Sequence, residues 1–124
     1  MMSLAYRWWS PVLLFHSVFH KVPRDLEGHV HNVTPDDFRR IVSELSRSFE
    51  FVFVDEFISK SGTKPRCAIT FDDAYDCIFD DALQILRDLN IPSTVFVNCS
   101  SLEGTVFWRD RVRWLIRNLS LIHI

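Results

Sequence analysis

Apolar residues along the chain fall into short continuous runs and longer periodic stretches. The runs PVLLF (11–15), RCAITF (66–71) and STVFVN (93–98) are each bounded by polar or turn-forming residues. Runs of this kind are typical of strands that are buried on both faces. The segment FEFVFVDEFI (49–58) alternates before it reaches its acids, so we expect a further strand there.

Three other stretches repeat apolar residues at helical spacing. The stretch 34–49 opens with threonine, proline and two aspartates, which suit the N-cap, the first helical position and the positive end of the helix dipole. A second helix is expected from about residue 76 to Asn90, where the following Ile-Pro pair prevents continuation. The stretch 107–119 predicts a third helix.

The predicted order is strand, helix, strand, short helix, strand, helix, strand, helix. Apolar strands that alternate with helices indicate an α/β fold with about four parallel strands, and we expect helices on both faces of the sheet. A length of 124 residues fits one domain, 1–124. Because the sequence stops in LSLIHI without a polar cap, we expect this domain to be incomplete.

Composition narrows the function classes. The net charge of −2 gives no electrostatic reason to expect a nucleic acid or an anionic membrane as partner. No apolar stretch reaches the ~20 residues of a membrane span, and the first residues lack an export signal, so the cytoplasm is the default expectation. Three cysteines without C-x-x-C spacing favour neither a disulfide framework nor a structural zinc site. We expect a solvated face from the basic cluster Arg109, Arg111, Arg113 and Arg117.

Two adjacent acids, Asp72 and Asp73, follow the apolar run 66–71 directly. Parallel sheets gather ligands at the carboxyl ends of their strands. Since side chains alternate along a strand, both acids can address one site only if the backbone turns there. One acid could then hold a cation while the other takes a proton from water, as in metal-assisted hydrolysis. The ordinary alternative is that these acids cap the next helix.

A wider set of motifs resembles the polysaccharide deacetylase (NodB-homology) family. LLFHSV, VTPDDFRRIVSEL, AITFDDAYDCIFDDALQILRDLNIPSTVFV and FWRDRVRWL follow the family in order and spacing over residues 11–117. The resemblance implies the N-terminal part of an irregular, TIM-like (β/α) barrel with a divalent metal, zinc being the first candidate. It further implies hydrolysis of the carbon–nitrogen, non-peptide bond of N-acetylated sugars, or removal of O-acetyl groups, with carbohydrate as partner.

The same resemblance assigns roles to residues of the T-F-D-D motif. It implies that Asp72 is the catalytic base and that Asp73 is a metal ligand. Tyr75 matches the family pattern and is expected to pack beside the site. Ala74 stands where the family usually has glycine, a departure expected to tighten the turn slightly.

The metal needs more ligands than one carboxylate, and the family supplies two histidines from an H-[ST]-x-x-H motif after the acids. HSVFH (16–20) copies the letters but precedes the acids, so we expect His16 at a strand end near substrate or metal, and His20 in a loop. HVH (29–31) could chelate a metal but is more typical of a solvated loop. His123 lacks the rest of the motif.

Two functional hypotheses follow. In the first, the chain is part of a metal-dependent deacetylase and by itself binds metal weakly and shows little activity. In the second, it is a non-catalytic carbohydrate-binding or self-associating module that pairs through an open barrel edge. A receiver-like domain with an acidic pocket ranks last, because Asn98 stands where a phosphoacceptor aspartate would be expected.

Overall fold

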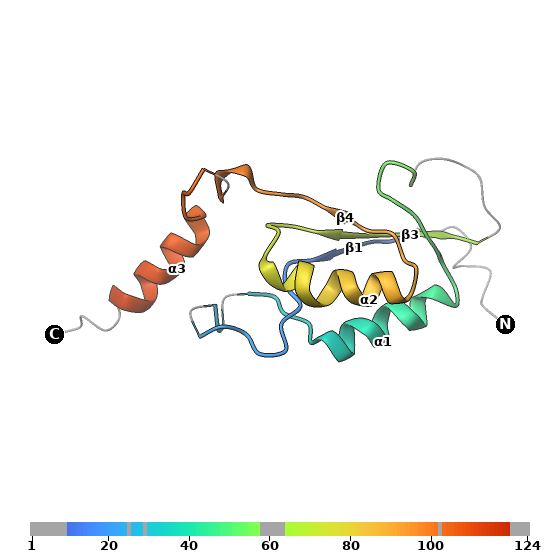
Figure 1. Ribbon diagram of the computed structural model, residues 1–124, viewed down its shortest axis with the longest axis horizontal. Coiled ribbons are helices and arrows are strands. Elements are labelled where there is room, and N and C mark those ends of the chain that lie inside the picture. Colours follow the sequence, from blue (N-terminus) through green and yellow to red (C-terminus); the bar gives the residue numbers. More distant parts are fainter. Residues whose placement is uncertain (1–9, 25, 29, 58–63, 102, 120–124) are drawn as a thin grey trace.

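The computed structural model describes residues 10–24, 26–28, 30–57, 64–101 and 103–119. Strands and helices alternate along the chain as the sequence predicts (Figure 1). In chain order they are β1 (Val12–Phe15), α1 (Pro35–Ser46), β2 (Glu50–Phe51), β3 (Arg66–Phe71), the π-helical turn η2 (Ile78–Ala82), α2 (Leu83–Asp88), β4 (Thr94–Val95), the 3-10 turn η3 (Cys99–Ser101) and α3 (Trp108–Leu119).

The four strands of the described ranges form one parallel sheet with β3 at its centre. Thr70 of β3 pairs with Leu14 of β1 and with Thr94 of β4, so β1 and β4 lie on opposite edges of β3. The short strand β2 pairs with the start of β3, on the edge that it shares with β4. The predicted α/β class with a parallel sheet is confirmed.

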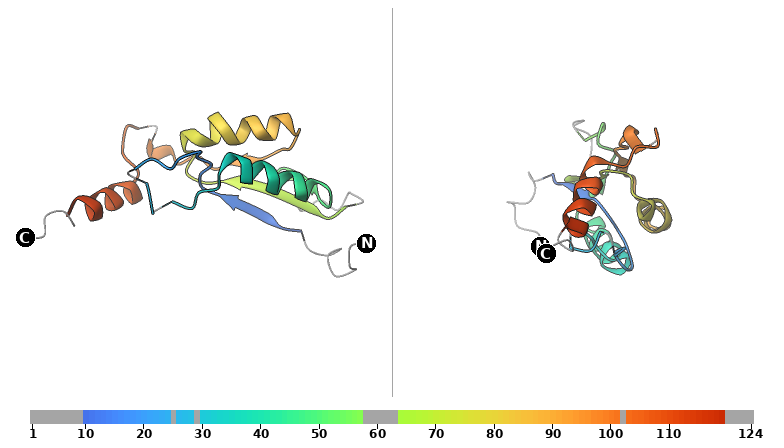
Figure 2. Two further views of the ribbon diagram at one scale, coloured as in Figure 1. Left: turned by 90° about the horizontal axis from the view of Figure 1, so that it is seen from below. Right: turned by 90° about the vertical axis from the view of Figure 1, so that its left-hand side faces the viewer.

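Both α1 and α2 cover the same face of the sheet, as the views in Figures 1 and 2 agree. The expectation of helices on both faces is therefore wrong for the described residues. The connections β1–α1–β2 and β3–α2–β4 cross the sheet in the same direction. Parallel crossovers share one hand, so two that run in the same direction place their helices on the same side.

Side chains alternate across the sheet in agreement with this arrangement. Phe15 and Phe71 point toward the helices, where the Phe15 ring meets that of Phe38 of α1 edge-on at 5.0 Å. On the opposite face, Val12 and Leu14 remain 48% and 53% exposed. The core thus lies between β3 and the two helices, and consists of Val18, Phe38, Val42, Ile69, Phe71, Cys77, Ile78, Ala82, Ile85 and Leu86.

Local signals fix the ends of two helices. The Thr34 hydroxyl accepts a hydrogen bond from the Asp37 N–H at 3.2 Å, which confirms it as the N-cap of α1. At the end of α2, Asn90 has a φ of 53°, and the N–H of Ile91 donates to the Leu86 carbonyl at 2.9 Å. This pattern is a Schellman motif with asparagine at the left-handed position.

Two strands are shorter than the sequence predicts. In the stretch 49–58, only Glu50–Phe51 is a strand, because residues 54–57 form turns with 3.1 Å and 3.4 Å hydrogen bonds to the carbonyls of Phe53 and Val54. In 93–98, pairing is limited to Thr94–Val95. The short helix expected between the second and third strands falls partly on residues 58–63, which lie outside the described residues.

The helix α3 lies beyond the carboxyl edge of the sheet, away from both sheet faces (Figure 1). It confirms the helix predicted at 107–119. The carboxyl ends of β1 and β3 therefore face α3 across the end of the sheet (Figure 1).

Of the helices within the described residues, none is long and apolar enough to cross a membrane.

Candidate functional site at the carboxyl edge of the sheet

The chain turns sharply directly after β3. The Asp72 N–H still donates to the Phe15 carbonyl at 3.1 Å, so Asp72 keeps the strand register. The next two residues take left-handed backbone angles, with φ values of 69° at Asp73 and 52° at Ala74. By strand alternation Asp72 belongs to the open face of the sheet, whereas the turn redirects Asp73 toward β1. The backbone turn that two neighbouring acids require is present.

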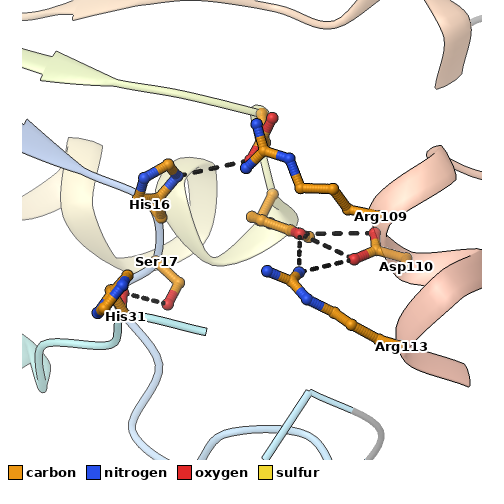
Figure 3. A network of polar contacts seen from close by, with 8 residues as sticks. His16, Ser17, His31, Arg109, Asp110 and Arg113 are labelled. Carbon is orange, nitrogen blue, oxygen red and sulfur yellow. Dashed lines mark hydrogen bonds and ion pairs between the residues drawn. The ribbon is translucent and has the colours of Figure 1, made fainter. Parts of the chain in front are cut away.

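Asp73 is the centre of a charged contact at the strand ends. His16 follows β1, and its Nδ1 lies 3.5 Å from Asp73 Oδ2. A guanidinium nitrogen of Arg109 from α3 lies 3.7 Å from the same oxygen. The Asp73 side chain is only 13% exposed. Two strand ends and a distant helix thus converge on one carboxylate, and Figure 3 shows His16 and Arg109 on facing sides of the site.

Aromatic rings hold Arg109 at the site. Its guanidinium carbon lies 5.2 Å from the centre of the Phe107 ring and 6.0 Å from that of Trp108. A guanidinium at these distances is attracted by the negative face of a ring. The Arg109 side chain therefore packs against the aromatic rings at the start of α3 while its guanidinium contacts Asp73.

Tyr75, Asp110 and Arg113 form a second polar cluster, next to the contact of Asp73 with His16 and Arg109. The Tyr75 hydroxyl donates to the Asp110 carboxylate at 3.2 Å, and Arg113 pairs with Asp110 at 3.0 Å. Burial, together with the negative charge of Asp110, raises the pKa of Tyr75. The phenol therefore stays protonated and can donate at neutral pH. Figure 3 shows Asp110 and Arg113 extending from α3 into the same space.

The loop after β1 closes the site from the other side. Asn32 fastens this loop: its side-chain oxygen accepts from the Phe19 N–H at 2.7 Å and lies 3.0 Å from the Ser17 hydroxyl. The loop thereby brings the exposed His31 ring to 6.3 Å from that of His16. A hollow of about 240 Å³, the histidine cavity, is lined by His16, Val30, His31, Asp73, Tyr75, Arg109 and Arg113.

A second hollow adjoins the histidine cavity across Asp73 and Tyr75. This middle cavity, of about 400 Å³, is lined by Asp73, Ala74, Tyr75, Asp76, Gly104, Thr105, Val106, Phe107 and Asp110. Asp72 lines neither cavity, and within the described part of the chain its side chain makes no ion pair or hydrogen bond. Asp73 is thus the acid that both cavities share.

The structure separates the histidines that the sequence offered as metal ligands. His16 contacts Asp73, whereas His20 lies 3.4 Å from Asp81, on the helix side of the sheet. Of the HVH pair, His31 lines the histidine cavity, and His29 lies outside the described residues. The pattern HSVFH therefore does not form one chelating pair.

The described residues fit only part of a metal site. Catalytic zinc takes three protein ligands and one open position. Across the described ranges, no three histidine, cysteine or acidic side chains form a group that could hold a metal ion. His16 and Asp73 are the donor pair at the strand ends, and the cation of Arg109 already contacts that carboxylate.

Sequence reasoning missed the contribution of α3. Arg109 and Arg113 were expected on a solvated face, but they contact Asp73 and the Tyr75–Asp110 pair. The expectation is therefore wrong for these two residues, while Arg111 does lie exposed. A signal was available in WRDRVR, since Arg109 and Arg113 are four residues apart and share one side of a helix.

Comparisons with known proteins identify a family that part of the chain matches. Residues 59–115, which include β3, its acids and most of α3, match the family described as polysaccharide deacetylase. The resemblance of this chain to the polysaccharide deacetylases is confirmed. A search of curated proteins gave no significant match. The deacetylase match thus covers Asp72, Asp73, Tyr75 and three arginines of α3, Arg109, Arg111 and Arg113.

Solved structures extend the likeness across most of the chain. IcaB from Ammonifex degensii is 20% identical, with a TM-score of 0.59 over 71% of this chain and 37% of that chain. The Streptococcus pyogenes deacetylase PplD, solved with acetate, is 17% identical, with a TM-score of 0.62 over 82% of this chain and 49% of its own. A de-N-acetylase from Aggregatibacter actinomycetemcomitans is 20% identical, with a TM-score of 0.58 over 78% of this chain and 40% of that chain.

These structural matches define the fold. The chain spans less than half the length of these solved structures, between 37% and 49%. Its parallel sheet and helices correspond to the N-terminal part of the deacetylase barrel fold, as the sequence resemblance implied. In such a barrel, the face of the sheet that lacks helices is the one that points inward.

Proposed function

We propose that the chain contributes to a hydrolase that removes acetyl groups from acetylated sugars of a polysaccharide. The observation that carries the proposal is the convergence of His16 and Asp73 from neighbouring strand ends, and Asp73 lies in the segment 59–115 that matches the deacetylase family. The reaction would break the carbon–nitrogen bond of an N-acetyl group, or the ester bond of an O-acetyl group, and release acetate. The deacetylase PplD was solved with acetate, which supports this class of product.

Within this proposal the two acids have different roles. Asp72, unpaired among the described residues and directly after β3, would accept the proton of the attacking water as general base. Asp73, held between His16 and Arg109, would supply one carboxylate ligand of a divalent metal, with zinc the first candidate. His16 would lie beside that ligand, and Tyr75 would form part of the wall.

Because the described residues supply only part of a metal site, we expect the chain alone to bind metal weakly and to release little acetate. The test is a chimera in which this chain replaces the matching part of PplD, and acetate release from an N-acetylated chitin oligomer is the readout. We expect the chimera to be active and Asp72→Asn to lower kcat at least about 100-fold, the usual contribution of a general base.

Matched variants make the result specific. Asp80→Asn removes an exposed acid that lines neither the histidine cavity nor the middle cavity, and should leave the rate unchanged. Asp73→Asn should lower both zinc binding and activity. Circular dichroism would establish that each chimera is folded. A folded chimera without activity, or full activity of the Asp72→Asn chimera, would contradict the proposal.

A second candidate is a non-catalytic, carbohydrate-binding or self-associating barrel fragment. The observation that favours it is the open sheet face, where Val12 and Leu14 are 48% and 53% exposed. Apolar side chains gathered on one exposed face are typical of a surface that another element covers. Acetate release by the chimera would favour the enzyme, whereas an inactive, folded chimera would favour this alternative.

A further inference from the structure

A third hollow continues from the middle cavity along α3. This outer cavity, of about 480 Å³, is lined by Leu26, Val106, Asp110, Arg111, Trp114 and Leu115. It shares Val106 and Asp110 with the middle cavity, which in turn shares Asp73 and Tyr75 with the histidine cavity. The three hollows therefore follow one another from Trp114 to His16.

The lining of the outer cavity combines one aromatic surface with charged groups. Trp114 is 58% exposed, and Leu115 and Val106 are also exposed, so the apolar wall is open to a ligand. Asp110 and Arg111 supply a carboxylate acceptor and guanidinium donors beside it. Its volume falls in the usual range of small-ligand sites, about 300–1,000 Å³.

We propose that the outer cavity is a subsite for a second sugar ring of an N-acetylated hexosamine oligomer whose acetylated ring lies at Asp72 and Asp73. A pyranose presents C–H groups on its faces and hydroxyls on its rim. The C–H face packs against an indole, whose ring face is negative, while the hydroxyls bond to charged side chains. The proposal rests on the proposed function, because it takes the reacting ring to lie at the acids.

Continuity with the acidic site favours a sugar chain over another protein as the occupant. A polysaccharide is linear and must extend from the reacting ring in at least one direction. The outer cavity opens from the middle cavity through Asp110, which the Tyr75 hydroxyl and Arg113 already hold in place. A ring on Trp114 would thus belong to the same chain as a ring at Asp73.

The test measures how tightly the full chain binds tetra-N-acetylchitotetraose, by isothermal titration calorimetry. Trp114→Ala should weaken binding about tenfold, the loss expected for a stacked aromatic ring. Phe79→Ala is the matched control, because Phe79 is an aromatic residue that is 51% exposed but lines none of the three hollows. This control substitution should leave the affinity for the tetrasaccharide unchanged. Neither substitution should change the affinity for the monosaccharide N-acetylglucosamine.

Other outcomes overturn the inference. Equal losses for Trp114→Ala and Phe79→Ala would make the effect nonspecific, and absence of binding to the tetrasaccharide would rule out the subsite. A dimer in sedimentation that Trp114→Ala dissociates would make this face a contact between copies instead. Since binding needs no catalysis, an Asp72→Asn chain whose affinity still falls with Trp114→Ala but not with Phe79→Ala would support the subsite even if the proposed reaction is not found.

Discussion

At the scale of single residues, the turn after β3 determines where the acids point. Asp73 and Ala74 both have positive φ values, 69° and 52°. Aspartate tolerates the left-handed region because its short polar side chain bonds locally, whereas alanine has no such compensation. The family that this chain resembles usually has glycine at position 74, a residue that would avoid the strain that Ala74 carries.

Ala74→Gly should therefore stabilise the protein. A left-handed non-glycine residue costs about 1–2 kcal/mol, and glycine's greater freedom in the unfolded chain offsets part of the gain. We expect a net increase of about 0.5–1 kcal/mol in the free energy of unfolding, measured with urea. Ala82→Gly, in the helical turn η2, should have the opposite sign and lose about 1 kcal/mol. A lower free energy of unfolding for Ala74→Gly would contradict the inference that the backbone is strained at Ala74.

Arg109 should compete with a metal ion for Asp73. Its guanidinium lies 3.7 Å from Asp73 Oδ2, and a divalent cation at that oxygen would meet a like charge. Arg109→Gln should raise the affinity for Co²⁺ or Zn²⁺ about threefold, a modest gain because Arg109 is partly exposed. Isothermal titration calorimetry measures the metal affinity of the variant and of the unsubstituted chain.

The control for Arg109 is Arg111→Gln, which removes the same charge from the same helix without a contact to Asp73. It should change the metal affinity much less. If both substitutions have equal effects, net charge rather than the contact with Asp73 is responsible. Asp73→Asn should remove most of the binding in either background.

At the scale of elements, β3 carries both the site and the centre of the fold. It pairs with all three other strands, and its residues from Cys67 to Phe71 are buried. Cys67 is fully buried, and burial raises its pKa from 9.0 to about 11. The folded state therefore keeps a thiol proton that the unfolded chain releases.

This difference makes stability depend on pH in the alkaline range. The contribution of Cys67 is fully present below pH 9.0 and is lost as the pH rises through about 11. The free energy of unfolding should fall over that range, by roughly 2–3 kcal/mol from this thiol. Cys67→Ala should make the pH profile flatter. Cys99→Ala, at an exposed cysteine, should leave the profile as it is.

At the scale of the whole molecule, the helices α1 and α2 cover one face of the sheet, and no helix within the described residues covers the other (Figures 1 and 2). The helices α1 and α2 bury Ile69 and Phe71 on their side, and Phe15 packs partly buried against the same core. The opposite face exposes Val12 and Leu14, and it is also the face on which alternation places Asp72. In a closed barrel this face would lie inside, packed against the remaining strands.

We expect the isolated chain to self-associate through that face. Leu14→Lys should lower the association measured by sedimentation velocity at tens of micromolar protein, because a charge disrupts an apolar contact. Phe79→Lys, at a 51% exposed residue of η2, is the matched control and should leave association unchanged. A stable monomer of the unsubstituted chain would contradict this expectation.

The sequence by itself determined where most elements lie and which two acids follow β3. Thr34 fixed the start of α1 and Asn90 the end of α2, because caps act through hydrogen bonds within a few residues. The apolar run 66–71 predicted β3, and the two acids after it marked the strand end where the candidate site lies. These features depend on neighbours in sequence, so a local pattern carries them.

Tertiary structure alone decided which side chains meet. The Tyr75 hydroxyl contacts Asp110 across 35 residues of sequence, and Arg109 reaches Asp73 only because α3 lies beyond the end of the sheet. The shared direction of two crossovers decided which face stayed open. Helical and strand periodicity show which side of an element is apolar, but the partner of each polar side is set by how distant elements pack.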